Sequence, residues 1–249
     1  MKKMNYLSLL TIMMVALFSV GFVSCSSDKD DEGAKIDTTP ISLLAGDSKT
    51  IQGADTISSS NKFVAYSAGD KVYGWHVGEA SLLVNGKETI SISVLPMYTL
   101  YDDPICNWGC NVTYVSQRQK QGTKSTKSTN DQLAYENAGA ATLLAYDFKN
   151  GKLDKITAVV STNHASQYAS YLAERYLMIP TYYGKDTYFC GSDGVNLASS
   201  KTAVVMMVYS IEYLVTIYMP ANQFTGTTRS FDNYFFKNEE ALSVIKDIL

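Results

Sequence analysis

The sequence predicts an all-β sandwich over residues 36–96, followed by a two-layer α+β domain over residues 97–249. Short apolar runs separated by glycine-containing turns fill the first region, whereas helical spacing and hairpin patterns alternate in the second. Leu95-Pro96 separates the two, since proline ends a strand ladder. A chain of 249 residues has room for two modest domains, which typically contain about 100 to 150 residues each.

The N-terminal residues have the pattern of a signal peptide. Lys2 and Lys3 precede an apolar run from Leu7 to Val23, which is interrupted by hydroxyl residues and ends in small ones. A permanent spanning helix would need about 20 apolar residues, so it is the weaker interpretation. We therefore expect residues 1–24 to be a signal peptide that is removed before Cys25.

Phe22-Val23-Ser24-Cys25 resembles the lipobox of bacterial lipoproteins, with Phe22 where leucine is usual. The resemblance implies that the Cys25 sulfur receives a diacylglycerol, which would make a membrane the first partner. Residues 25–35 are rich in Ser, Asp and Glu, which predicts a solvated tether. This run also resembles the acidic export tag of Bacteroidetes lipoproteins, which implies attachment to the outer membrane facing the cell exterior.

The sandwich is predicted from short strands with turn signals between them. Asn85-Gly86 supplies the residue pair that a tight hairpin turn requires, and the run after it alternates between apolar and polar residues. The predicted strands are Ile41–Leu44, Thr50-Ile51, Phe63–Tyr66, Val72-Tyr73, Ala80–Val84 and Ile90–Val94.

Three segments of this region, residues 44–51, 63–65 and 74–82, resemble the bacterial immunoglobulin-like domain of group 2. The resemblance covers about sixty residues. It implies an immunoglobulin-like fold used for display or binding, without catalysis.

The second domain is predicted to repeat a helix followed by hairpin strands. Asn111 is expected to cap a helix that begins near Val112, and Asn163 to cap a helix over residues 165–177. The remaining predicted elements are a mobile loop over 119–131, a hairpin of 140–148 with 153–161 around Asn150-Gly151, a strand over 182–190, a hairpin over 203–219 that turns near 210–212, and a helix over 239–249.

The run from Tyr146 to Leu153 has a Phe, Asn-Gly, Leu pattern. It resembles the uncharacterised modules that follow immunoglobulin-like domains in Bacteroidetes lipoproteins. It also resembles the helix–hairpin repeat of β-lactamase-inhibitor-like and small outer-membrane-assembly lipoproteins. Both resemblances imply contact with another protein.

Three cysteines remain after lipidation of Cys25: Cys106, Cys110 and Cys190. Export to an oxidising compartment predicts a disulfide of Cys190 with Cys106 or Cys110, and a Cys106–Cys110 bridge is the rival pairing. A Cys-x₃-Cys spacing with no second pair or nearby histidine does not complete a tetrahedral metal site. We therefore predict no metal.

The sequence offers no catalytic constellation. His76 and His164 have no acid or nucleophile at motif spacing, and Asp102-Asp103 is explained by a polar turn. There is no phosphate-binding glycine loop or nucleophile elbow, so we predict no catalytic residue and no cofactor. Removal of residues 1–24 takes away two lysines and no acid, which changes the net charge from −3 to −5, and much of it lies in the tether. This balance argues against a nucleic-acid partner.

Trp75 and Trp108 are the candidate ligand-contact aromatics, although Trp108 beside two cysteines is the better candidate for the core. The sequence thus favours a non-catalytic surface lipoprotein that acts in adhesion or binds a glycan or protein. The alternative is an assembly or inhibitory factor that binds another envelope protein through its second domain. An enzyme is the third and least favoured class.

Overall fold

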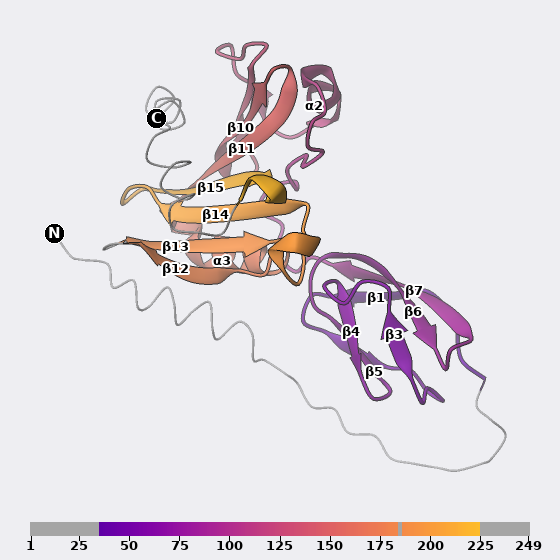
Figure 1. Cartoon of the computed structure of the whole chain (residues 1–249). Coiled ribbons are helices and arrows are strands. Elements are labelled where there is room, and N and C mark those ends of the chain that lie inside the picture. The colour runs from indigo at the N-terminus through magenta and orange to yellow at the C-terminus, as the bar shows by residue number, and fades with distance from the viewer. Residues whose placement is uncertain (1–34, 184–185, 225–249) are drawn as a thin grey trace. The chain divides into compact units, whose positions relative to one another are not determined.

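A computed structural model describes residues 35–183 and 186–224. Within these ranges the protein is mostly β-sheet, with fifteen strands in three sheets and two short α-helices (Figure 1). This composition is consistent with a β-sandwich. No helix in the described ranges is long and apolar enough to span a membrane.

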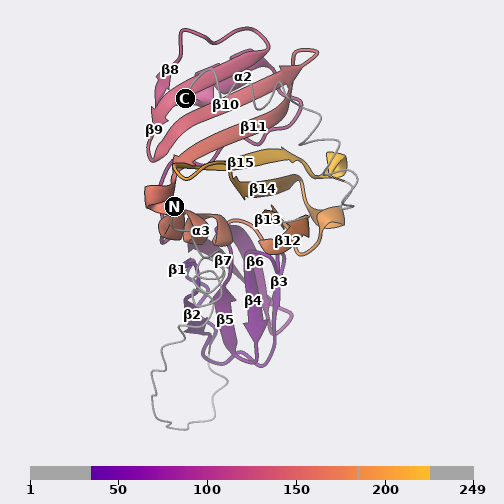
Figure 2. The same cartoon turned by 90° about the vertical axis from the view of Figure 1, so that its left-hand side faces the viewer.

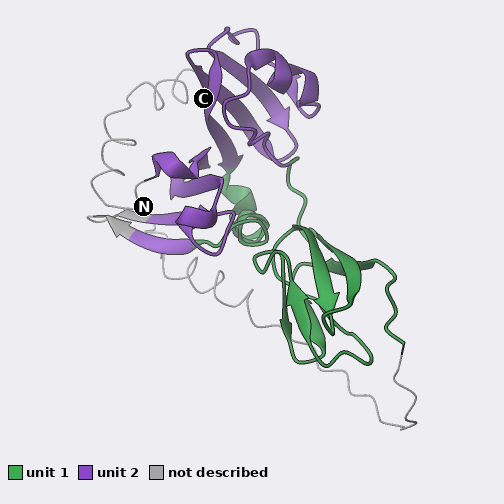
Figure 3. Cartoon of the chain, turned by 45° about the vertical axis from the view of Figure 1, so that its right-hand side comes forward, with its two compact units in different colours: residues 1–102, 161–178 green, residues 103–160, 179–249 purple. Residues whose placement is uncertain are grey.

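The chain divides into two compact units (Figure 3). Unit 1 contains Met1–Asp102 and Ser161–Met178, and unit 2 contains Asp103–Val160 and Ile179–Leu249. The chain therefore passes from one unit to the other three times. The segment 161–178, which the sequence assigns to the second domain, belongs to unit 1.

Unit 1 contains two small sheets, of strand order β1-β7-β6-β3 and β2-β5-β4. Alternate residues of β7 are buried, as the sequence pattern predicts. The strands are β1 Ile41–Leu44, β2 Ser48–Thr50, β3 Ile57–Ser59, β4 Ala65–Ala68, β5 Lys71–Gly74, β6 Gly78–Val84 and β7 Glu88–Leu95. Buried side chains of these strands and of the residues next to them share one core of Ile41, Ala45, Ile51, Val64, Ala65, Val72, Leu82, Val84, Ile90, Ile92 and Val94.

The predicted hairpin at Asn85-Gly86 is confirmed, since β6 and β7 pair antiparallel on either side of it. Asn85 has a φ of 51° and Gly86 a φ of 67°, the left-handed conformations that this turn requires. The Asn85 side chain also accepts hydrogen bonds from the backbone N–H groups of Asp55 at 2.7 Å and Thr56 at 3.0 Å. The turn thereby fixes the loop before β3.

The helix α3, Ala165–Ala173, packs within unit 1 and is shorter than the predicted 165–177. Asn163 is not its cap; a 3-10 turn η1, Thr162–His164, comes first, and Ser161 caps that turn. Tyr168 and Tyr171 of α3 are fully buried beside Tyr101, whose hydroxyl is 3.1 Å from that of Tyr168.

The residues after α3 bind the chain that leaves β7. The Glu174 carboxylate accepts hydrogen bonds from the backbone N–H groups of Met97 and Tyr98, at 3.1 to 3.2 Å. Arg175 donates to the Tyr98 carbonyl at 3.4 Å, and the Val77 N–H donates to the Glu174 carbonyl at 2.7 Å. This set of contacts around Glu174, which we call the exit clamp, ties α3 to both β6 and β7.

Unit 2 is built on one sheet of eight strands, ordered β12-β13-β14-β15-β11-β10-β9-β8 (Figure 2). The two-layer α+β arrangement of residues 97–249 remains a prediction. The elements of unit 2 are α2 Val112–Arg118, β8 Thr123–Lys124, β9 Gln132–Ala138, β10 Ala141–Lys149, β11 Lys152–Ser161, β12 Ile179–Tyr183, β13 Asp186–Ser192, η2 Leu197–Ser199, β14 Thr202–Val208, β15 Tyr213–Pro220 and η3 Ala221–Gln223.

Several predictions for this unit are confirmed. The β10–β11 hairpin turns at Asn150-Gly151, and the β14–β15 hairpin turns between Val208 and Tyr213. Asn111 caps α2 by accepting from the Tyr114 N–H at 2.9 Å. The predicted strand 182–190 is wrong, because β12 ends at Tyr183 and β13, which pairs antiparallel with it, begins at Asp186.

The segment 119–131, predicted as a mobile loop, contains the edge strand β8, and Ser125 is buried there with its N–H bonded to the Ala134 carbonyl. Gln119 accepts a hydrogen bond from the Tyr146 hydroxyl at 2.7 Å, which ties the end of α2 to β10. The predicted helix 239–249 lies outside the described residues.

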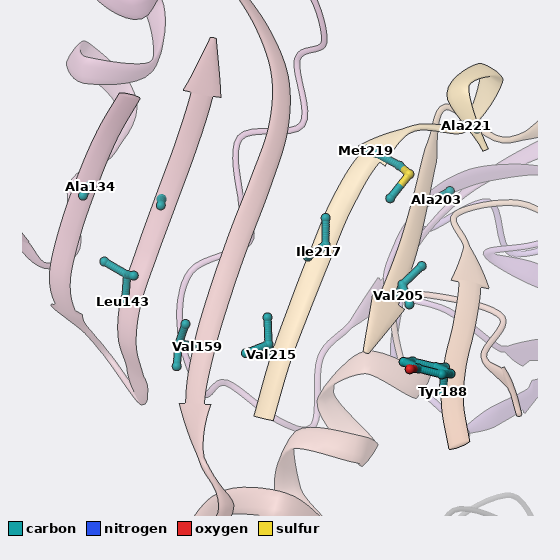
Figure 4. Close-up of a cluster of buried hydrophobic side chains, with 11 residues drawn as sticks. Ala134, Leu143, Val159, Tyr188, Ala203, Val205, Val215, Ile217, Met219 and Ala221 are labelled. Atoms are coloured by element: carbon teal, nitrogen blue, oxygen red, sulfur yellow. The ribbon is translucent and has the colours of Figure 1, made fainter. Parts of the chain in front are cut away.

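One face of the large sheet carries an apolar cluster (Figure 4). It extends across the neighbouring strands β9, β10, β11, β15, β14 and β13. Phe224, the last described residue, packs against it. Its buried members are Ala134, Leu143, Ala145, Val159, Tyr188, Ala203, Val205, Val215, Ile217, Met219 and Ala221.

Candidate functional site

Three aromatic side chains lie together on the outer side of the β2-β5-β4 sheet: Tyr66, Tyr73 and Trp75. On β5, buried Val72 and Gly74 alternate with the more exposed Lys71 and Tyr73, and Trp75 continues this outward series. Tyr66 of β4 is directly opposite Tyr73 in the strand register. We call these three residues the aromatic face.

The rings of the aromatic face contact one another. Those of Tyr66 and Tyr73 are stacked, with centroids 5.1 Å apart and planes 9° apart. The Trp75 ring meets Tyr66 edge-on, with centroids 5.9 Å apart and planes at 80°. Tyr66 is 39% exposed, while Tyr73 and Trp75 are half-buried. The contacts between the rings hold their positions, and each keeps part of its surface in solvent.

A second aromatic layer lies beneath Trp75. The His76 ring is buried and stacks on Phe63, with centroids 3.8 Å apart, and its Nδ1 is 2.8 Å from the Phe63 carbonyl. Burial lowers the pKa of His76 to about 4, although the hydrogen bond to Phe63 opposes this. The imidazole is therefore neutral at neutral pH, and it packs at 4.6 Å from the Trp75 ring as an uncharged support.

The surroundings of the aromatic face are polar with little charge. Ser48 and Thr50 of β2 stand opposite Tyr73 and Lys71 in the register, so they share its side of the sheet. Lys71 is the cation on this stretch of β5. Ring surfaces beside hydroxyl groups can pack against C–H groups of a ligand and exchange hydrogen bonds with its polar groups.

Trp108 is half-buried in unit 2, and its Nε1 donates to the Thr202 hydroxyl at 3.2 Å. Its polar atom is therefore already bonded within the protein. Trp75 and Trp108 belong to different units, and the structure places only Trp75 in an aromatic face.

Cys106, Cys110 and Cys190 are free thiols in the structure, and none of the predicted pairings is formed. Burial raises the pKa of Cys106 to about 12, and it also raises the pKa of Cys110 and that of Cys190. Thiols with raised pKa values are protonated at neutral pH, which makes them weak nucleophiles.

Two further site predictions concern lipidation and metal binding. Cys25, the predicted lipidation site, lies outside them. Within residues 35–183 and 186–224, no group of three or more His, Cys, Asp or Glu side chains is arranged to hold a metal ion.

The comparisons with known proteins give no relative: no family model, curated protein or solved structure matches this chain. The resemblances of the two domains to known families therefore remain predictions.

The sequence pointed to Trp75 but missed Tyr66 and Tyr73. A signal for them was present in the two-residue turn Gly69-Asp70, where Gly69 has a φ of 64°. A hairpin centred on this turn pairs residues at equal distances from it, so Tyr66 must face Tyr73. The alternation along β5 then places Trp75 on the same side.

Proposed function

We propose that this protein is a non-catalytic lipoprotein of the bacterial outer surface, anchored through Cys25, that binds a neutral glycan through its aromatic face. The observation that carries the proposal is the cluster of Tyr66, Tyr73 and Trp75. These rings contact one another on the outside of a sheet and keep part of their surface in water.

The chemistry of the aromatic face favours a sugar. A pyranose ring presents C–H groups on one face and hydroxyls around its edge, which matches ring surfaces flanked by Ser48 and Thr50. Lys71, the cation of β5, gives by itself little attraction for a strongly anionic ligand. The small area of three rings fits a few sugar units better than a protein interface, which buries about 800 Å² on each partner.

The test measures glycan binding by the mature chain, residues 25–249, on a glycan array and then by calorimetry with a selected oligosaccharide. We expect Tyr66→Ala and Trp75→Ala each to weaken binding by about 30-fold, which corresponds to the 2 kcal/mol of an aromatic hot spot. The matched control is Leu83→Ala, which removes a side chain of similar exposure, 42%, from the other sheet. Its affinity should equal that of the unaltered protein.

Equal affinity in all three variants would refute the aromatic face as the binding site. Absence of binding to every glycan, combined with binding to a protein ligand that Trp75→Ala abolishes, would retain the site and replace the ligand class.

Location is tested separately, by proteinase digestion of intact cells that carry the native protein or the Cys25→Ala variant. Digestion of the native protein without lysis supports surface display. Protection until lysis would instead indicate an anchor that faces the periplasm and would contradict the proposed location.

A second candidate function is suggested by the order of elements after residue 110. Helix α2 precedes the strands β8 to β11, and α3 precedes β12 to β15, so a helix followed by four strands occurs twice along the chain. This order supports an α+β module with helix–hairpin repeats, and with it an assembly or inhibitory factor that grips an envelope protein. Alanine at exposed Lys124, Thr126 and Lys127 distinguishes the two functions: loss of a cross-linked protein partner with glycan binding intact would favour the second.

A further inference from the structure

We propose that unit 1 is a load-bearing element, in which β1 and β7 together resist tension applied between the N-terminal tether and unit 2. The property follows from the direction of two strands and from the exit clamp. It does not use the aromatic face, but the load itself rests on the proposed anchoring through Cys25.

The two strands are parallel, with Ile41 opposite Ile92 and Leu44 opposite Leu95. The chain from the N-terminus enters this pair at Ile41, and the chain toward unit 2 leaves it at Leu95. These points lie at opposite ends of the pair. Tension between them therefore slides one strand along the other and loads all of their hydrogen bonds at once.

Sliding of β1 would also disturb the core. β1 is an edge strand whose sheet neighbour is β7, and its Ile41 side chain is 4% exposed within the sandwich core. The Ala45 N–H extends the pairing by donating to the Leu95 carbonyl at 2.9 Å. Beyond it, the Gly46 N–H donates to the Gly74 carbonyl of the other sheet at 2.8 Å. Withdrawal of β1 must break these bonds and expose buried apolar surface together.

The exit clamp holds the other end of the load path. Glu174 binds the N–H groups of Met97 and Tyr98, the residues that directly follow β7 and Pro96. Its carbonyl also binds Val77 at the start of β6. Tension that arrives along the chain after Tyr98 is therefore shared between β7 and, through α3, β6.

The clamp also explains why a helix from the second half of the sequence belongs to unit 1. Tension on unit 2 reaches unit 1 through three covalent connections, after Asp102, before Ser161 and after Met178. The last two flank the segment that carries the clamp. In a lipoprotein anchored through Cys25, a partner bound by unit 2, as in the second candidate function, pulls along this path, and unit 1 stays folded under that load.

The experiment is single-molecule force spectroscopy on the mature chain, with one handle at the N-terminus and the second at one of two exposed positions. Thr99→azidophenylalanine places the second handle beyond β7, which loads the strand pair in shear. Lys87→azidophenylalanine places it in the turn before β7, so the same N-terminal handle peels β1 from β7 one residue at a time. We expect the rupture force of unit 1 to be at least about twofold higher with the handle at Thr99.

The clamp has its own matched pair of variants in the Thr99 geometry. Glu174→Ala removes the acceptor for Met97 and Tyr98 and should lower the rupture force, whereas Glu79→Ala on the exposed side of β6 should leave it unchanged. Equal rupture forces in the two pulling geometries of the unaltered protein would overturn the proposal. That comparison decides even if Glu174→Ala fails to fold.

Discussion

The buried His76 predicts that unit 1 loses stability in mild acid. Its ring is 2% exposed and stacks on Phe63, and burial lowers its pKa to about 4 in the folded protein. In the unfolded chain the imidazole titrates near its ordinary value of 6.5. Between these two values the unfolded chain binds more protons, so the free energy of unfolding must fall as the pH falls.

The magnitude follows from the two pKa values. Well above pH 6.5 the imidazole is neutral in both states, so this group contributes no pH dependence there. At about pH 5 the unfolded histidine is almost fully protonated and the folded one is not, which costs about 2 kcal/mol relative to pH 7.5. The loss approaches about 3 kcal/mol as the pH falls to 4.

The assay is equilibrium urea unfolding at pH 7.5 and pH 5, followed by Trp75 fluorescence in a Trp108→Phe background, so that the signal reports unit 1. The matched variant, His76→Phe, keeps a ring stacked on Phe63 but cannot titrate. It should lose about 1 kcal/mol at pH 7.5 through the missing bond to the Phe63 carbonyl, and should then lack the additional 2 kcal/mol loss at pH 5. Parallel pH dependence of the two proteins would refute the reasoning, because all other titrating groups are shared.

Two further predictions concern close packing in unit 1 and a hydrogen bond in unit 2. Gly78→Ala should destabilise unit 1 by about 1 to 3 kcal/mol in urea unfolding, because the new Cβ would lie 2.8 Å from a methyl group of Val64 and the backbone φ is +149°. The control, Gly86→Ala, has open space around it and should cost only about 1 kcal/mol for its positive φ. Equal losses of stability in the two variants would contradict the steric argument. Tyr146→Phe should destabilise unit 2 by about 1 to 2 kcal/mol, because it removes the bond from the Tyr146 hydroxyl to Gln119 and the acceptor of the Ile105 N–H. Unfolding followed through Trp108 measures the loss, and an unchanged midpoint would contradict the prediction.

The features predicted correctly from the sequence are those decided by neighbouring residues. Asn85 and Asn150 both adopt φ values near 50°, and each is followed by a glycine with positive φ. The requirement for these conformations is local, so the two hairpins could be placed without the fold. The Asn111 cap depends likewise on a residue three positions away.

The features that the sequence missed depend on distant partners. The division of the predicted strand 182–190 into β12 and β13 is an exception, because Gly184 within it is a local turn signal that the strand prediction overlooked. Parallel pairing of β1 with β7 joins residues about fifty positions apart, and its direction has no signature in either strand. The site shows the same division: Trp75 stands out by residue type, whereas its role with Tyr66 and Tyr73 depends on strand register.

The exit clamp shows why a composition boundary need not be a structural one. Leu95-Pro96 ends the strand pattern, but the N–H groups of Met97 and Tyr98 find their acceptor on Glu174, nearly eighty residues later. Burial raises the pKa of Glu174, while these amides and Arg175 act in the opposite direction, so the carboxylate depends on them as much as they depend on it. A sandwich cut at residue 96 would lose a partner for the Val77 N–H, and α3 without the sandwich would lose the amides around its carboxylate. The compact unit is therefore the discontinuous one, because its closing contacts come from both sides of residues 103–160 in the sequence.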